Sequence, residues 1–532
     1  MKKYSILGLV GIVFGLLFGS CYKDLGNYDY HEINEVAIAD VGFADTVYEL
    51  RSFIDTLRIS PQVENTIIQN IDNYEFRWVA VGDRFKLGGT WEIGTQKDLV
   101  YPLNLPEQDY TLFFHIKDKT TEVVTTRSVK LTLTTMFSKG WLLWGEGENG
   151  IAQLDMLVET AEDTILMKDI LKESGLPALQ KPTFLFVPFA DMTEVNIQIG
   201  TESGTYKLDR NKLLPIEDAH LKYSFWDLSS AGNCVLQDAN QLYAFRAEVI
   251  DGNLYFDRDR MAGKYSRIGN PSNHYKGEYK LFKMGNKIGY NLSMLGSRYP
   301  VIICYDDDAK QFVYQGGVNQ YSGIEGYCDP IPVVQGNDTW KPGLDFVTTI
   351  NSRNAQISNY TILKKPNAAS SSDYYLYVYQ IVATNFNVSF TMRMQPQQMT
   401  NAEDIQNAEF YASSLNKPYI FYTVGSKLYG YDCYKFKSTL LLDFAGENIH
   451  EENGEKVAEV ITAVWSEQYL FPPSMNDEFY IALYDPNKPA SSGGRIVGYR
   501  VLDNADAIQL EEIPGTSKSG LCKVVSMAYK AR

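Results

Sequence analysis

The sequence predicts an all-β protein in which a β-sandwich near the N-terminus is followed by a β-propeller of about seven blades. Three observations carry this prediction: the composition, a strict alternation of apolar and polar residues between positions 73 and 135, and hairpins that recur after residue 140. The 532 residues include 37 tyrosines, 26 phenylalanines and 40 glycines, which favours strands joined by many turns. The length suits about two to four domains.

The first 20 residues have the pattern of an export signal. Lys2 and Lys3 precede an apolar run that ends at Phe18 and is shorter than the about 20 residues of a membrane span. Gly19 and Ser20 then stand directly before Cys21. We therefore expect residues 1–20 to be a lipoprotein signal peptide, Cys21 to be lipidated as in a bacterial lipobox, and residues 21–34 to be an acidic tether. The alternative is an ordinary signal peptide with an incidental cysteine.

Charge and cysteine content exclude several classes of function. A formal net charge of −16 without a cluster of lysines and arginines argues against nucleic acid as a partner. Five cysteines besides Cys21 are widely spaced, which favours buried free thiols, although one bridge between Cys304 and Cys328 is an alternative. The five histidines are far apart in the sequence, so we expect neither a histidine-rich zinc site nor another metal or cofactor.

Residues 35–137 predict the β-sandwich. The segments 73–81, 109–118 and 126–135 alternate apolar and polar residues, as half-buried antiparallel strands do. Several such strands within about 100 residues indicate an immunoglobulin-like arrangement. Trp78 is then expected to be the core tryptophan and Tyr110 a corner tyrosine, with a ligand platform at Trp78 as the alternative.

The same region carries a family resemblance. The lipobox, the entry CYKDLGNYDYHEINEV, the strands YEFRW and DYTLFFHIKD and the following GWLLW resemble the PKD-like lipoproteins of Bacteroidetes outer membranes. The resemblance covers residues 1–150. It implies a PKD-like module close to a lipid anchor and an association with SusC/SusD-type nutrient uptake, and it supplies no catalytic residue.

Residues 138–532 predict the propeller. Hairpins with an aliphatic or aromatic pair, a tyrosine or similar residue and a polar turn recur at spacings of one or two units of about 35–50 residues, the range of propeller blades. Their markers are Tyr206, Tyr243, Tyr314, Tyr377, Tyr429 and Val497. We expect the segment 523–529 to close the ring beside 141–144, and the spacing within 161–175 to form a helix. An array of two or three β-sandwiches is the alternative.

Catalytic motifs are absent from the sequence. It contains no GxSxG, HExxH or Walker pattern, and Asp306–Asp308 sits between two strands, where a solvated turn is expected rather than a calcium site. Carboxylates are plentiful, so a pair suited to glycoside hydrolysis is compatible with the sequence, but nothing selects two of them.

Aromatic residues in turn-rich segments are the candidates for ligand binding. Aromatic faces flanked by carboxylates and amides can stack on sugars or hold aromatic side chains, and the alternative is packing under long loops. We expect the loop 321–345 to contribute most. The candidates are Trp226, Tyr321, Tyr327, Trp340 and Trp465.

The signal sequence predicts a lipid-anchored protein, and the resemblance implies that it lies in the outer membrane, where we expect it to face the cell exterior. We expect it to bind an oligosaccharide or a peptide without catalysis and, as the resemblance implies, to be an accessory to a TonB-dependent transporter and its lid lipoprotein. One alternative is an anchored polysaccharide hydrolase or lyase with a carboxylate pair in the propeller cavity. Another is a purely structural spacer or adhesin.

Overall fold

The computed structural model describes most of the chain after the predicted tether. The described residues are 34–40, 43, 47–68, 70–83, 88–160, 163–188, 196–229, 231–242, 245–257, 268–290, 301–315, 326–332, 338–352, 359–383, 388–415, 417–452, 454–466, 477–502 and 507–531. The expected signal peptide, Cys21 and Tyr321 lie outside them.

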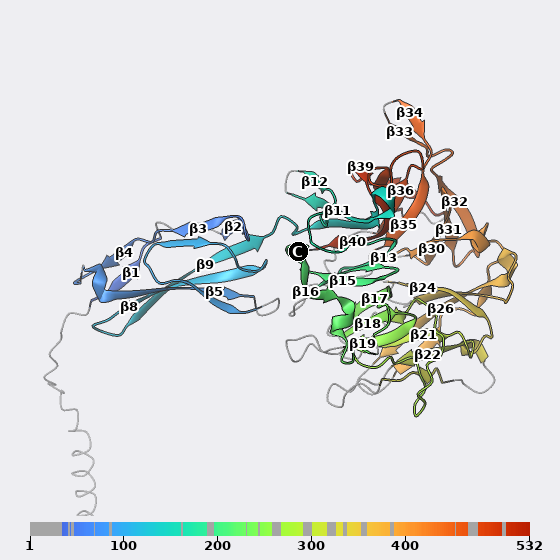
Figure 1. The fold of residues 1–532 in the computed structure, drawn as a ribbon, viewed down its shortest axis with the longest axis horizontal. Helices are drawn as coiled ribbons and strands as arrows, with labels where there is room; N and C mark the ends of the chain where they lie inside the picture. The colour runs from blue at the N-terminus through green and yellow to red at the C-terminus, as the bar shows by residue number, and fades with distance from the viewer. Residues whose placement is uncertain are drawn as a thin grey trace, which may run out of the picture.

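The N-terminal domain is built from strands in two layers (Figure 1). Its main sheet has the order β2-β9-β8-β5-β6, in which β2 and β9 run parallel and the other pairs antiparallel. These strands are β2 (Val47–Arg51), β9 (Val124–Thr134), β8 (Asp109–Asp118), β5 (Tyr74–Gly82) and β6 (Thr90–Gly94). Two short pairs complete the domain: β3 (Thr56–Ile59) with β7 (Leu99–Pro102), and β1 (Val36–Ile38) with β4 (Val63–Asn65). The three strands predicted from alternation are confirmed as β5, β8 and β9.

The core of this domain confirms the roles expected for two aromatic residues. Trp78 is fully buried and stacks on Phe114 with ring centroids 4.3 Å apart. Leu57 of β3 and Leu99 of β7 pack in the same cluster, so the short pair covers the main sheet as the second layer of a sandwich. The Tyr110 hydroxyl donates to the Pro106 carbonyl at 2.8 Å, the bond of a corner tyrosine.

The rest of the chain forms seven successive sheets, each mostly an antiparallel meander. Sheets one to three contain β40 (Lys523–Lys530), β10 (Gly140–Glu146), β11 (Ala152–Glu159) and β12 (Thr164–Met167); β13 (Pro182–Phe186), β14 (Ile197–Thr201), β15 (Gly204–Leu208) and β16 (Pro215–His220); and β17 (Leu236–Leu242), β18 (Phe245–Ile250) and β19 (Asn253–Asp257). Sheets four and five contain β20 (Gly289–Tyr290), β21 (Ile302–Asp306), β22 (Gln311–Gln315) and β23 (Asp329–Pro330); and β24 (Asp345–Asn351), β25 (Asn359–Lys364), β26 (Tyr374–Ala383) and β27 (Val388–Met392), with β28 (Gln397–Gln398) beside β26. Sheets six and seven contain β29 (Tyr411–Ser413), β30 (Tyr419–Val424), β31 (Lys427–Asp432) and β32 (Lys437–Asp443); and β35 (Val460–Ser466), β36 (Glu478–Tyr484), β37 (Gly494–Val501) and β38 (Leu510–Glu512), with β39 (Lys518–Leu521) beside β37. A hairpin of β33 (His450–Glu452) and β34 (Glu455–Val457) stands apart.

These sheets follow one another in a propeller-like arrangement (Figure 1). The first strands of neighbouring sheets contact each other: β35 contacts β40, β40 contacts β13, and β13 contacts β17. The same holds for β20, β24, β29 and β35 in turn. The last strand of the chain, β40, pairs with β10, so Gly140 lies opposite Lys530. The first sheet therefore contains the beginning and the end of this region.

The meander topology gives the set of sheets two distinct ends. In an antiparallel meander, the links between first and second strands and between third and fourth strands lie at one end. The turns between second and third strands, and the links from one sheet to the next, lie at the other. We call the end with the links between first and second strands the docking end, because the N-terminal domain packs there. We call the end with the turns between second and third strands the far end.

Contacts with the N-terminal domain locate the docking end. The Lys212 ammonium, in the turn between β15 and β16, lies 4.7 Å from the centre of the Phe53 ring. Lys530, at the end of β40, donates to the Ser138 carbonyl at 2.8 Å and approaches Glu107. At the same end of the sheets, Arg210, which follows β15, donates to the carbonyl of Ala531, which follows β40, at 2.8 Å.

One expected element is wrong. Residues 161–175 were expected to form a helix, but the described part of this segment holds strand β12 and a turn. The pairing of β12 with β11 as the outer strand of the first sheet outweighs a local spacing that fits a helix. The helices among the described residues are 3₁₀ turns of three or four residues.

Candidate functional site

Of the predicted binding residues, Trp226 is the most accessible one in the described part of the chain. It lies at the far end, in the link between β16 and β17, and its exposed fraction is 69%. Its backbone N–H donates to the Ile268 carbonyl at 3.0 Å, which holds the link in place. Tyr223 and Leu228 nearby in sequence are also exposed.

The other tryptophans pack into the protein. Trp340 is 8% exposed, and its ring centroid lies 5.5 Å from those of Phe312 and Tyr379. Trp465 is partly buried, edge-on to Trp141 at 4.8 Å. Their polar sequence neighbours did not reveal this, because the packing partners come from distant strands.

Tyr327 is half-buried, with the Lys276 ammonium 5.3 Å from its ring centre. The structure therefore places the described candidates in different links and strands. None of these four residues lines either of the two pockets of the far end.

The aspartates at 306–308 are held by the protein itself. Asp306 is buried and accepts from the backbone N–H groups of Asp308 at 2.9 Å and Ala309 at 2.8 Å, and from the Tyr275 hydroxyl. Asp307 forms ion pairs of 2.8 Å with Lys283 and Lys310. These bonds show that the protein itself pairs Asp306 and Asp307. The segment is a turn, as expected, but Asp306 is buried and not solvated. No group of three or more metal-ligating side chains occurs among the residues that the structure describes.

The cysteine expectation holds for the described thiols. Cys234, Cys304, Cys328, Cys433 and Cys522 are free and buried, so Cys304 and Cys328 are not bridged. The two thiols are close enough to interact. A hydrogen bond with Cys304, together with burial, raises the pKa of the Cys328 thiol.

A pocket of about 550 Å³ at the far end is the strongest candidate site. Three segments form it: the turn between β10 and β11, the link from β12 to β13, and Ser491 from the turn between β36 and β37. The β10–β11 turn bends at Asn149 and Gly150, both with positive φ, which these residues tolerate. We call it the loop pocket. Its lining is Gly147, Glu148, Ile151, Ala152, Gln153, Lys168, Asp169, Leu171, Lys172, Leu176, Pro177, Ala178, Leu179 and Ser491.

Asp155 holds the segments around the loop pocket together. This fully buried side chain on β11 accepts from the Gln153 amide and from the Asp169 backbone N–H, both at 2.8 Å. Its other oxygen accepts from the Cys522 N–H at 2.8 Å, directly before β40. One carboxylate thus joins β11 of the first sheet, the link between β12 and β13, and the residue that precedes β40.

The loop pocket carries charges of both signs. Glu148, Lys168 and Lys172 make no side-chain hydrogen bond or ion pair with the described residues, and all three are exposed. Burial, together with the nearby Asp155 and Glu148 carboxylates, raises the pKa of Asp169, while Lys172 and Lys168 oppose the shift. The lysines only partly offset the negative field at Asp169.

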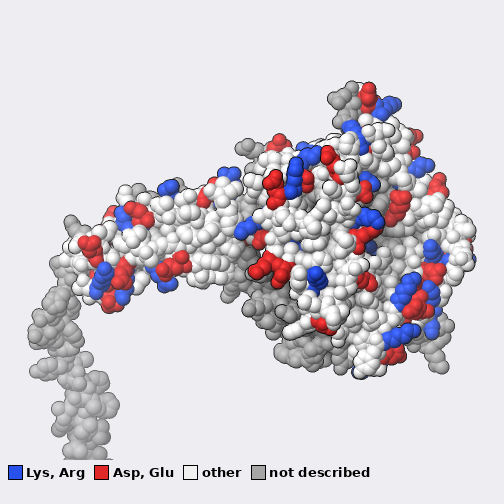
Figure 2. Space-filling model, viewed as in Figure 1, with Lys and Arg blue, Asp and Glu red and all other residues white. Residues whose placement is uncertain are grey.

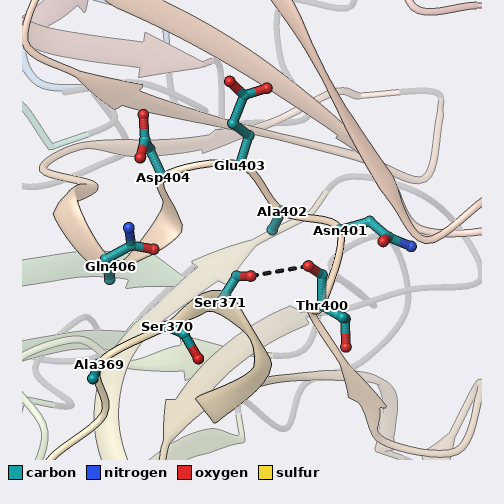
Figure 3. A pocket seen from close by; sticks show the side chains of 9 residues that line it. All are labelled: Ala369, Ser370, Ser371, Thr400, Asn401, Ala402, Glu403, Asp404 and Gln406. Carbon is teal, nitrogen blue, oxygen red and sulfur yellow. Dashed lines mark hydrogen bonds between the residues drawn. The ribbon is translucent and has the colours of Figure 1, made fainter.

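A second pocket, of about 380 Å³, lies between the fifth and sixth sheets at the same end. It is lined by Ala369, Ser370, Ser371, Thr400, Asn401, Ala402, Glu403, Asp404 and Gln406. The Ser371 hydroxyl donates to the Thr400 carbonyl at 2.9 Å, and the Glu403 and Asp404 side chains extend away from this pair (Figure 3). The smaller volume and the diverging side chains favour the loop pocket.

The family comparison concerns the N-terminal part of the chain. Residues 21–182 match the PKD-like family, which covers the N-terminal domain and the strands β10, β11 and β12. No curated protein matches the chain. Within the described ranges, no helix has the length and apolar character needed to cross a membrane.

Three solved structures are similar at low scores. A quinoprotein alcohol dehydrogenase-like protein from Bacteroides thetaiotaomicron has a TM-score of 0.36 and 12% identity, covering 92% of this chain and 99% of that one. Hsv2 from Kluyveromyces lactis has a TM-score of 0.35 and 8% identity, covering 71% and 98%. The N-terminal domain of Nup159 has a TM-score of 0.30 and 9% identity, covering 65% and 93%. At these scores none of them indicates what this protein binds.

Proposed function

We propose that this protein is a lipid-anchored outer-membrane lipoprotein that binds its ligand without catalysis, as an accessory to SusC/SusD-type uptake of glycans or peptides. In this proposal the seven sheets are the blades of a β-propeller closed by β40, and Cys21 carries the lipid at the cell exterior. The leader sequence and the PKD-like match of residues 21–182 support it.

One observation carries the proposal: the N-terminal domain packs at one end of the seven sheets, and both pockets lie at the other end. The N-terminal domain is elongated, and β1 lies at its extremity away from the seven sheets (Figure 1). Its other extremity packs against the docking end, through Phe53 and Glu107. Both pockets and Trp226 lie at the far end.

Such a layout suits capture of a ligand away from the membrane. A lipid on Cys21 would precede the described chain by only 13 residues, so the N-terminal domain would serve as a stalk. On the face shown in Figure 2, acidic and basic side chains are interspersed, which does not favour a strongly charged polymer as the ligand.

The test is co-purification of the tagged full-length protein from gently solubilised outer membrane, followed by mass spectrometry. Recovery of a TonB-dependent barrel with its lid lipoprotein would support the accessory role. Recovery of the protein alone would contradict it. The same purification from cells that express the untagged protein controls for nonspecific capture.

A second candidate function is an anchored polysaccharide hydrolase or lyase. The observation that favours it is the pair of carboxylates in the loop pocket, because burial and neighbouring acids raise the pKa of Asp169 as a general acid requires. Glu148 and Asp169 line the loop pocket, whereas the carboxylate pair was expected in the propeller cavity. Product release from polysaccharide that Asp169→Asn and Glu148→Gln each abolish would establish this function over capture alone.

A further inference from the structure

The chemistry of the loop pocket distinguishes between the two ligand classes that the proposed function leaves open. Its apolar lining is aliphatic and includes Ile151, which is 42% exposed, together with Leu171, Leu176 and Pro177. None of its described lining residues is aromatic. Sugar rings are usually held by stacking on aromatic faces, so this lining is a poor match for an oligosaccharide.

The charged groups of the pocket match a zwitterion. Glu148 and Asp169 supply carboxylates, and Lys168 and Lys172 supply ammonium groups, within one cavity. Because the Glu148, Lys168 and Lys172 side chains form no ion pair among the described residues, a ligand would not have to break one to bind. Charge-assisted hydrogen bonds in a partly enclosed site are stronger than those between neutral groups.

Hydrogen bonds hold the floor of the pocket at Gln153 and Asp169. Asp155 fixes the Asp169 backbone, and the Gln153 amide donates to the Ser491 carbonyl at 3.4 Å as well as to Asp155. The volume of about 550 Å³ lies within the about 300–1,000 Å³ of small-molecule sites. It suits a short chain and not a folded partner.

We infer that the loop pocket binds short peptides with apolar side chains, whose α-ammonium meets Glu148 and Asp169 and whose carboxylate meets Lys168 and Lys172. This inference rests on the ligand-binding function proposed above and narrows it to one class. The aliphatic lining takes the peptide's side chains, and the charges hold its two ends.

The experiment is calorimetric titration of the full-length protein in detergent with three probes. These are trileucine with free ends, trileucine acetylated at the N-terminus and amidated at the C-terminus, and maltohexaose. We expect trileucine to bind, and the blocked form to bind at least about tenfold more weakly because both charge-assisted contacts are lost. We expect no binding of maltohexaose in this pocket.

Variants test the site itself. Glu148→Gln and Lys172→Met should each weaken trileucine binding about tenfold and leave the blocked peptide's affinity unchanged. Glu403→Gln, in the second pocket at the same end, is the matched control and should bind like the unmodified protein. Both altered side chains of the loop pocket are exposed, so thermal unfolding should confirm that the variants fold normally.

Three outcomes would overturn the inference. They are binding of maltohexaose without trileucine, trileucine binding that Glu148→Gln leaves unchanged, and no binding of either probe. A failure of this kind is separable from failure of the proposed function, because recovery of the transporter in the co-purification would still support the accessory role.

Discussion

Lys530 and Glu107 meet where the N-terminal domain joins the last strand of the chain, with the ammonium nitrogen 3.8 Å from a carboxylate oxygen. Their side chains are only 1% and 5% exposed. Burial, followed by the positive charge of Arg210, lowers the pKa of Lys530 to about 7 despite the attraction of Glu107. The junction between the two parts of the protein therefore holds a pair of ionisable groups that is withdrawn from water.

Removing one member of this pair should destabilise the protein. At about pH 6, where Lys530 is protonated in the folded protein, we expect Lys530→Met to lower the free energy of unfolding by about 3 kcal/mol, because the Glu107 carboxylate stays buried without its cation. Replacing both residues, as Glu107→Leu with Lys530→Met, should recover most of the loss, since no charge is then buried. Urea unfolding followed by circular dichroism measures both changes. A double variant no more stable than the single one would contradict this account.

The same lysine should make stability depend on pH. The unfolded chain binds the lysine proton with the ordinary pKa of 10.5, whereas the folded protein binds it with a pKa of about 7. Between these values the unfolded state holds more protons, so stability should rise with pH, by up to about 1.4 kcal/mol per pH unit. Below about pH 7 the contribution becomes constant. Unfolding measured from pH 7.5 to 9.5 should show this rise in the unmodified protein relative to Lys530→Met, and parallel curves would argue against it.

Two tryptophans with similar sequence surroundings should respond differently to truncation. Trp340→Ala should cost about 3–5 kcal/mol, because the ring fills a buried cluster with Phe312 and Tyr379. Trp226→Ala should change stability by less than about 0.5 kcal/mol, because its ring is largely in solvent. Thermal unfolding of both variants is the measurement. Equal losses would mean that Trp226 is covered in the folded protein.

Asp155 should be essential for holding together the segments that it joins in the first sheet. In Asp155→Asn one oxygen becomes an N–H₂ group that faces a backbone donor, either at Asp169 or at Cys522. We expect a loss of about 2–3 kcal/mol, the cost of leaving a buried donor unsatisfied. Asp404→Asn is the control, because that side chain makes no capping bond where it stands. If both variants unfolded at the same temperature, Asp155 would not hold the segments as described.

The proposed anchor has its own test. Cys21→Ala should leave the protein unprocessed or release it from the membrane fraction, because the thiol is the site of lipidation in a lipobox. Fractionation with metabolic labelling by a fatty-acid analogue measures both effects. Normal labelling and membrane fractionation of the variant would contradict the lipoprotein assignment.

The N-terminal strands were predictable because their burial follows the period of the strand. In β8, side chains alternate between buried and partly exposed along its whole length, including the buried Leu112 and Phe114. The recurrence of hairpins after residue 140 also indicated repeated small sheets. The segment 161–175 was misread because the outer strand of a sheet is defined by its neighbour, here β11, and not by its own spacing.

The loop pocket was beyond prediction for a related reason. Glu148 lies in a glycine-rich turn that the sequence does reveal, and Lys172 follows β12 of the same sheet, but Ser491 comes from the turn between β36 and β37 in another sheet. No local pattern links positions more than 300 residues apart. The same limit explains Trp340, whose aromatic partners Phe312 and Tyr379 come from two different sheets.

The pairing of β40 with β10 also determines when the protein can finish folding. Because synthesis begins at the N-terminus, β10 is made long before Lys523–Lys530, and every residue of β10 except Glu146 is buried in the finished fold. During that interval β10 has an open edge able to pair with other chains. Loss of only residues 523–532 would therefore leave this edge of β10 without its partner strand.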